Sequence, residues 1–264
     1  MTIKGILGGI LVATVAVACR PAPSPGVTEA DRPTVVFVHG AWAGGWHFQK
    51  VESLFRAEGF EVYRPTMTGL GERVHLADPQ VDLSTHVEDI VKVLEFERLD
   101  RVVLVGHSYG GMVISGVAER VPYRIAQLVY LDAMVPEDGE SVMDLAGERI
   151  PRMARLDGDG DEPWRLVPLW VKDGKPPPVD VPQPLATFTE PIRLANLDAR
   201  RLPATFVLTT EAGKETDDFD FFADRARDRG WTVVEMEGGH NPHWFQPEAL
   251  VDVLLGVFSE KTPP

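Results

Sequence analysis

Apolar runs and helical patterns alternate along most of the sequence. Six short runs are rich in β-branched and other apolar residues, and turn-forming residues separate them, which is typical of strands. Because these runs are continuously apolar, they predict strands buried on both faces, as in a parallel sheet. The six runs are residues 34–38, 60–64, 101–105, 127–131, 205–209 and 232–236.

Helical patterns fall between these runs. In the segment that begins at Leu83, apolar residues recur at the spacing of one helix face, namely Val87, Ile90, Val91 and Leu94. Further helices are predicted at 112–121, 219–229 and 248–258. The alternation of strands and helices indicates an α/β protein with a doubly wound, mostly parallel sheet of about six strands.

One long stretch, residues 136–200, breaks this alternation. It contains ten of the chain's 22 prolines and shows no clear strand. A segment of this length is too long for a simple connection in a compact domain. We therefore expect a helical or irregular cap at 136–200, inserted between the core segments 33–135 and 201–260. Ligands of open α/β sheets bind outside the carboxyl edge of the strands, so the cap would roof the pocket there.

The sequence Gly106-His107-Ser108-Tyr109-Gly110 carries the candidate nucleophile. It directly follows the third apolar run and directly precedes a helical pattern, as a nucleophile elbow requires. Glycines are needed there because the turn between strand and helix is too tight for side chains. The positive end of the following helix dipole favours developing negative charge at this point. Ser108 is therefore the predicted nucleophile.

A serine hydroxyl needs a base, and the base follows the last strand in this kind of protein. His240 stands after the sixth apolar run and before the last helix, so it is the predicted base. The remaining histidines are interpreted as surface, packing or loop-shaping residues. These are His39, His47, His75, His86, His107 and His243.

The acid that orients the base is expected just after the fifth strand. Glu211 is nearest to that strand end, and a glutamate can orient an imidazole as an aspartate does. Three other carboxylates stay open as alternatives. Asp217 and Asp218 lie further along the same loop, and Asp132 ends the fourth strand.

The oxyanion of an acyl-transfer intermediate needs two backbone N–H groups. Tyr109 follows the nucleophile and Ala41 lies in the loop after the first strand, so we assign the two donors to them. Four tryptophans are predicted to line an apolar substrate pocket, namely Trp42, Trp46, Trp164 and Trp170. This chemistry requires no metal ion and no organic cofactor.

Four motifs together resemble the α/β-hydrolase group of bacterial carboxylesterases, plant methylesterases and plant hydroxynitrile lyases. They are His39-Gly-Ala-Trp-Ala-Gly-Gly-Trp46, Thr68-Gly-Leu-Gly-Glu-Arg73, Gly-His-Ser108-Tyr-Gly-Gly and Leu131-Asp-Ala-Met-Val-Pro-Glu-Asp-Gly139. The resemblance runs from about residue 34 to the last helix, and it implies the α/β-hydrolase fold. It also implies an aspartate shortly after the fifth strand, where this chain has Glu211.

The same resemblance separates the possible activities. The plant lyases carry a threonine after the first-strand histidine and a lysine after the catalytic histidine. Here those positions hold Gly40 and Asn241. Without the lysine, a cyanide leaving group lacks its cationic partner. We therefore expect a carboxylesterase-like hydrolase of small esters, with a carbon–carbon lyase or a ligand-binding protein on a hydrolase scaffold as alternatives.

Charge and the N-terminal residues bear on partners and location. A formal net charge of −14 gives no reason to expect a nucleic-acid partner. Residues 1–18 resemble a signal peptide, and Cys19, the only cysteine, stands where the lipobox of bacterial lipoproteins has its lipidated cysteine. Residues 19–32 then form a Pro-rich tether. The expectation is an exported lipoprotein anchored at the membrane surface, with a secreted or periplasmic protein as the alternative.

Overall fold

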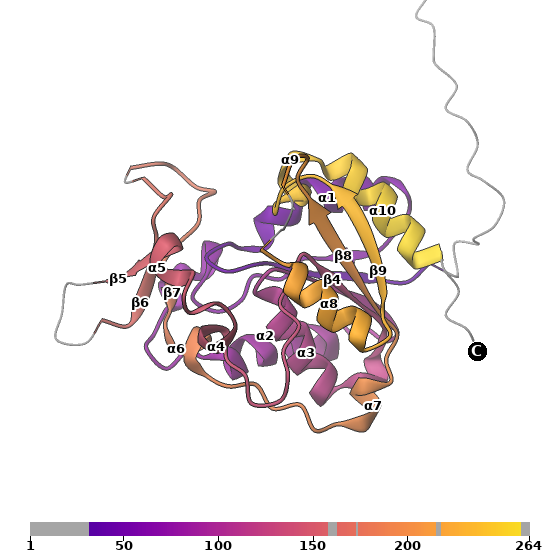
Figure 1. Ribbon diagram of the computed structural model, residues 1–264, viewed down its shortest axis with the longest axis horizontal. Helices are drawn as coiled ribbons and strands as arrows, with labels where there is room; N and C mark the ends of the chain where they lie inside the picture. The colour runs from indigo at the N-terminus through magenta and orange to yellow at the C-terminus, as the bar shows by residue number, and fades with distance from the viewer. Residues whose placement is uncertain (1–31, 158–162, 173, 215–217, 260–264) are drawn as a thin grey trace, which may run out of the picture. The chain divides into compact units, whose positions relative to one another are not determined.

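The computed structural model describes residues 32–157, 163–172, 174–214 and 218–259. Its central sheet has six strands, all parallel, in the order β2-β1-β3-β4-β8-β9. This confirms the predicted fold class (Figure 1). The strands are β1 (Val35–Val38), β2 (Val62–Tyr63), β3 (Val102–His107), β4 (Ile125–Leu131), β8 (Ala204–Thr210) and β9 (Thr232–Glu237).

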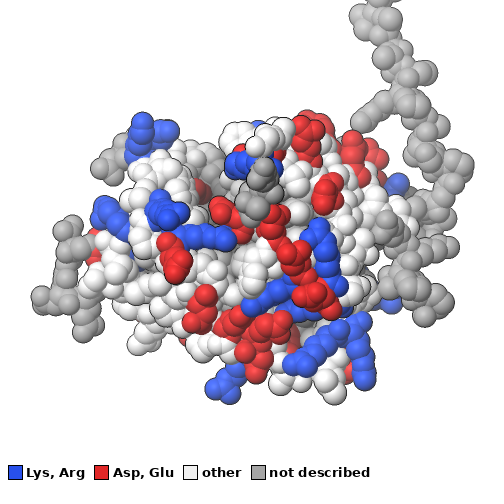
Figure 2. All heavy atoms as spheres, in the orientation of Figure 1, with Lys and Arg blue, Asp and Glu red and all other residues white. Residues whose placement is uncertain are grey.

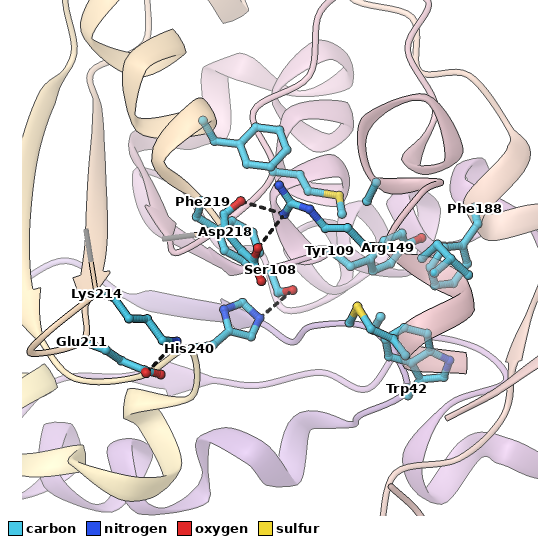
Figure 3. A pocket seen from close by; sticks show the side chains of 16 residues that line it. Trp42, Ser108, Tyr109, Arg149, Phe188, Glu211, Lys214, Asp218, Phe219 and His240 are labelled. Atoms are coloured by element: carbon cyan, nitrogen blue, oxygen red, sulfur yellow. Dashed lines mark hydrogen bonds and ion pairs between the residues drawn. The ribbon is translucent and has the colours of Figure 1, made fainter. Parts of the chain in front are cut away.

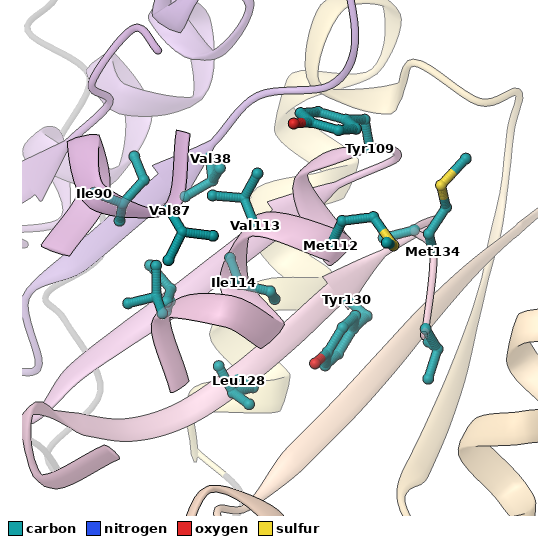
Figure 4. Packing of buried hydrophobic residues seen from close by; sticks show 14 of the residues in the cluster. Val38, Val87, Ile90, Tyr109, Met112, Val113, Ile114, Leu128, Tyr130 and Met134 are labelled. Carbon is teal, nitrogen blue, oxygen red and sulfur yellow. The ribbon is translucent and has the colours of Figure 1, made fainter. Parts of the chain in front are cut away.

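Successive residues of each central strand pack on opposite faces of the sheet. In β1, Val36 and Val38 belong to one apolar cluster, while Val35 and Phe37 belong to the other. The residues of both clusters are buried, which explains why β1 is apolar at every position. The first cluster is covered by α2 (Leu83–Phe96), α3 (Gly110–Arg120) and α8 (Asp220–Asp228), and the second by α1 (Gln49–Ala57) and α10 (Pro247–Ser259) (Figures 1 and 4).

The strand order reverses between β1 and β3. The chain runs from β1 outward to β2, then returns to place β3 on the other side of β1. The helices that follow these two strands lie on opposite faces, since α1 packs in one cluster and α3 in the other. The loops after β1 and β3 therefore diverge, which leaves a crevice at the carboxyl edge of the sheet. The loop at Gly40 and the elbow at Ser108 border this crevice.

The segment 136–200 contains strands, although none was predicted there. Three short antiparallel strands form a second sheet, β5 (Ala154–Leu156), β6 (Arg165–Pro168) and β7 (Gln183–Pro184). With two to four residues each, and with a proline at the end of β6 and of β7, they are too short to show an alternating pattern. The short helices of the segment are α4 (Val142–Ala146), α5 (Ile150–Met153), α6 (Ala186–Thr189) and α7 (Leu197–Arg200).

Ion pairs fasten the chain that follows β4 to helix α8. The Arg225 guanidinium donates to the Glu140 carboxylate at 2.5 Å, and Arg229 donates to Glu137 at 2.8 Å. Basic and acidic side chains lie interspersed on the face drawn in Figure 2. These pairs hold the start of segment 136–200 against the core.

The predicted signal segment 1–18, Cys19 and all of the tether except Arg32 lie outside the described residues. Within the described part of the chain, no helix is long and apolar enough to cross a bilayer.

Candidate active site

Ser108 lies in a sharp turn between β3 and α3. Its φ is 54°, a left-handed conformation that is strained for a residue with a side chain. The flanking backbone is too close for side chains, because a Cβ at Gly110 would lie 2.6 Å from the Val38 carbonyl oxygen and one at Gly111 would lie 2.1 Å from that of Met134. These close approaches explain the glycines of the motif, and they leave the Ser108 hydroxyl at the mouth of the crevice.

His240 meets Ser108 from the far end of the chain. It lies in the turn between β9 and α9 (Pro242–Phe245), and its Nε2 is 3.0 Å from Ser108 Oγ (Figure 3). The imidazole is packed between Phe219, which stacks on it at 4.6 Å between ring centroids, and His107, at the same distance. The structure thus brings together the two residues that were predicted as nucleophile and base.

Asp132 holds the other ring nitrogen of His240. His240 Nδ1 lies 2.6 Å from Asp132 Oδ2, and the Asp132 side chain is completely buried. The second carboxylate oxygen accepts a hydrogen bond from the Thr209 backbone N–H at 3.1 Å. Because a carboxylate oxygen is an acceptor, His240 Nδ1–H is the donor in this contact, which orients the imidazole and favours the tautomer with its proton on Nδ1. Nε2 is then free to accept the Ser108 proton.

The prediction that Glu211 orients His240 is wrong. Its carboxylate pairs with Lys214 Nζ at 2.6 Å, and its side chain is 43% exposed at the rim of the site (Figure 3). Asp218 is not the acid either, since it pairs with Arg149. Asp217 lies outside the described residues. The acid therefore comes from the end of β4, the strand hydrogen-bonded to β8.

Buried neutral histidines surround the catalytic histidine candidate. His107 Nε2 donates to the His240 carbonyl oxygen at 2.7 Å, which fixes the backbone of that turn. Burial lowers the pKa of His107 well below its usual value, and the pKa of His243 likewise. Both rings are therefore neutral at pH 7, so neither of them places a positive charge against protonation of His240 during a reaction. The sequence identified His107 only as a packing residue.

The loop after β1 lies against the nucleophile. A Cβ at Gly40 would be 3.2 Å from Ser108 Cβ, so this backbone runs directly beside the serine. His39 Nδ1 donates to the Gly40 carbonyl oxygen at 2.8 Å, and its Nε2 accepts from the Met67 N–H at 3.2 Å. Burial lowers the pKa of His39 to about 3, so it has one proton and this tautomer. Since the carbonyl and N–H of one peptide point in opposite directions, His39 also fixes the direction of the Ala41 N–H.

Two hollows meet at Ser108 and His240. The first has a volume of about 360 Å³ and the second of about 660 Å³, and the surface of both is mainly apolar, although charged side chains also line each of them. Characteristic side chains of the first are Met134, Ile150, Phe188 and Phe222. Those of the second are Trp46, Trp170, Trp244 and Phe245. Ala41 and Trp42 border both hollows.

Of the four tryptophans predicted for the pocket, Trp164 is the exception. Its ring lies beside the Arg165 guanidinium instead, 5.1 Å from ring centroid to Cζ, and it borders neither hollow. In the part of the chain that the structure describes, no cluster of three or more His, Cys, Asp or Glu side chains is arranged to hold a metal ion.

A parallel sheet with a serine on a strand–turn–helix elbow, and a histidine from the last strand's loop beside it, defines the class of α/β hydrolases. The sequence model of the alpha/beta hydrolase family matches residues 35–253, and the chain belongs to that family. Solved structures agree on the fold. The methylesterase protein MES16 from Arabidopsis is 20% identical, with a TM-score of 0.70, over 86% of this chain and 99% of that one.

The relatives found by sequence are esterases. The chain is 36% identical to a carbendazim hydrolyzing esterase of Nocardioides sp. (strain SG-4G). The alignment spans 239 residues and covers 84% of this chain and 98% of the relative. It is also 32% identical over 143 residues to methylesterase 1 of Arabidopsis thaliana, about half of each chain. These relatives place the chain among the carboxylic-ester hydrolases of its family.

Proposed function

We propose that the protein hydrolyses a small carboxylic ester through an acyl-enzyme formed on Ser108. The observation that carries this proposal is the unbroken chain of contacts from Ser108 Oγ through His240 to the buried Asp132. Such a chain supplies a nucleophile, a base and a group that orients the base, which is the arrangement that acyl transfer needs.

Each group has a defined step in this mechanism. Ser108 Oγ attacks the ester carbonyl while His240 Nε2 takes its proton, and the N–H groups of Ala41 and Tyr109 hold the oxyanion. The imidazolium, stabilised by Asp132, then gives that proton to the leaving alcohol oxygen as the carbon–oxygen bond breaks. In the second half, His240 takes a proton from water, which attacks the acyl-enzyme, and Ser108 regains its proton as the acid leaves.

The two hollows suggest how the ester lies. Attack at Ser108 places the acyl group on one side of the reacting carbon and the alcohol on the other, and an apolar hollow opens on each side. We assign one half of the substrate to each hollow, with Trp42 between them and Trp46 and Trp170 in the second. A substrate of this kind carries an apolar group on both sides of the ester bond.

The decisive experiment is hydrolysis of a p-nitrophenyl ester by Ser108→Ala. The variant should lose all turnover above background and all labelling by a fluorophosphonate probe, while its circular dichroism spectrum stays unchanged. Ser53→Ala, in which the lost hydroxyl bonds only the Gln49 carbonyl on the outer face of α1, is the matched control. It should retain full activity. Turnover that persists in Ser108→Ala would refute the proposal.

A further inference from the structure

The loop that supplies the proposed oxyanion donor is in a strained conformation. Trp42 has φ of 61°, and its side chain is buried. A residue with a side chain keeps this left-handed conformation only where its surroundings enforce it. Ala41 and Trp42 line both hollows together with Ser108, so the groups that enforce the conformation also influence the geometry of the site.

Segment 136–200 supplies those groups. The Trp42 backbone N–H donates to Gln183 Oε1 at 2.7 Å, and the Trp42 carbonyl accepts from the Val181 N–H at 2.8 Å. The indole Nε1 of Trp42 donates to the Leu166 carbonyl oxygen at 3.0 Å. Of these three contacts, only the bond from Gln183 to the Trp42 N–H is made by a side chain outside the loop. It is therefore the contact that a substitution can remove selectively.

Gln183 is itself held in one orientation. It is completely buried in β7, and its Nε2 donates to Thr187 Oγ1 at 2.8 Å. The Thr187 hydroxyl donates in turn to the Pro184 carbonyl at 2.7 Å, so its oxygen must accept from Gln183. The amide therefore cannot flip without losing both bonds, and its oxygen stays directed at the Trp42 N–H.

We propose that Gln183 is a positioning residue for the oxyanion hole. It fixes the Ala41–Trp42 peptide from one side, while His39 fixes the Gly40–Ala41 peptide from the other. With both flanking peptides held, the Ala41 N–H is set in direction before substrate binds, which is what lowers the barrier for oxyanion formation. The inference rests on the proposed esterase mechanism, in which Ala41 is a donor.

The test is Gln183→Met, which keeps the length of the side chain and removes the strong acceptor. We expect kcat for a p-nitrophenyl ester to fall about 10- to 100-fold, somewhat less than for loss of a whole oxyanion donor, with KM nearly unchanged. The rate of fluorophosphonate inactivation should fall by a similar factor, because that reaction also develops charge in the oxyanion hole. Gln183→Glu keeps an acceptor for the Trp42 N–H and should recover most of the lost kcat.

Glu190→Gln is the matched control for a merely structural role. The Glu190 carboxylate also ties segment 136–200 to the core, through the Ser84 N–H at 2.7 Å and the Ser84 hydroxyl at 2.6 Å, but it lies away from the loop. This variant should lower the melting temperature without lowering kcat per folded molecule. A raised KM with unchanged kcat in Gln183→Met, or equal kcat losses in the two variants, would overturn the proposal. Either result leaves Ser108-dependent hydrolysis intact, whereas turnover by Ser108→Ala would refute the mechanism itself.

Discussion

Asp132 and His240 lie 108 residues apart in the chain, yet Oδ2 of one is 2.6 Å from Nδ1 of the other. Three neighbouring parallel strands bring them together. Asp132 follows β4 and His240 follows β9, and β8 lies between these two strands and supplies the Thr209 N–H that also holds the Asp132 carboxylate. The carboxylate is buried and both of its oxygens have donors. Burying a carboxylate costs desolvation free energy, and the hydrogen bonds to both of its oxygens offset that cost.

Replacing Asp132 by Asn should therefore reduce kcat on the order of 10³- to 10⁴-fold, since an amide cannot stabilise the imidazolium and favours the wrong tautomer. Glu211→Gln is the matched control, because Glu211 pairs with Lys214 at the rim of the site. Steady-state hydrolysis of a p-nitrophenyl ester measures both. A large loss in Glu211→Gln together with an active Asp132→Asn would show that the acid has been assigned to the wrong strand.

The sequence predicted the central sheet well because its inner strands β1, β3, β4 and β8 have apolar residues on both faces. It placed Ser108 by its elbow and His240 by its position after β9. The acid was harder, since β4 and β8 end at the same edge and a carboxylate from either can reach the same imidazole. The informative signal was an aspartate that directly follows the apolar residues 128–131, where a solvated loop charge is not expected. The strands of segment 136–200 were too short to give any periodic signal.

The two hollows predict separable recognition of the two halves of the ester. Ile150 lines the first hollow, so we expect Ile150→Ala to lower kcat/KM for esters that are bulky in one half of the molecule. Trp170 lines the second hollow, so Trp170→Ala should lower kcat/KM for esters that are bulky in the other half. Each loss should be about 10-fold for a bulky group, as about 1.4 kcal/mol of lost apolar contact gives. A panel of four esters, small or bulky on each side of the carbonyl, measures it.

Methyl or ethyl groups in that panel serve as the internal control, because a small group leaves its hollow mostly empty. Each substitution should therefore leave kcat/KM nearly unchanged for esters whose group in that hollow is small. If both variants respond to the same half of the substrate, the two hollows form one binding site and the assignment fails.

The close packing around Gly111 predicts that a larger residue there lowers stability. A methyl group there would lie 2.1 Å from the Met134 carbonyl oxygen, which is a backbone atom of the chain following β4. Gly111→Ala should cost about 3 kcal/mol of unfolding free energy, at the upper end of overpacking effects. Gly256→Ala, on the exposed side of α10 with no atom within 4 Å, should instead stabilise by about 0.5–1 kcal/mol. Urea denaturation measures both, and equal effects of the two substitutions would contradict this account.

The buried histidines predict how stability depends on pH. Burial lowers the pKa of His39 to about 3 and of His86 to about 4, and it lowers those of His107 and His243. Above pH 6.5 these rings are neutral in both folded and unfolded chains. As pH falls below 6.5 the unfolded chain binds protons that the folded chain does not, so unfolding becomes easier by about 1.4 kcal/mol per pH unit for each such ring. The loss for His86 ends near its folded pKa of about 4.

Urea denaturation between pH 7 and pH 5 measures this slope as a number of protons. His86→Gln tests one ring, because an amide can accept from the Tyr109 hydroxyl and donate to the Thr68 carbonyl as His86 does. Its slope should fall by close to one proton relative to the parent protein. His75→Gln, at an exposed histidine, is the matched control and should leave the slope as it was. An unchanged slope in His86→Gln would mean that His86 takes up its proton in the folded chain, against its burial.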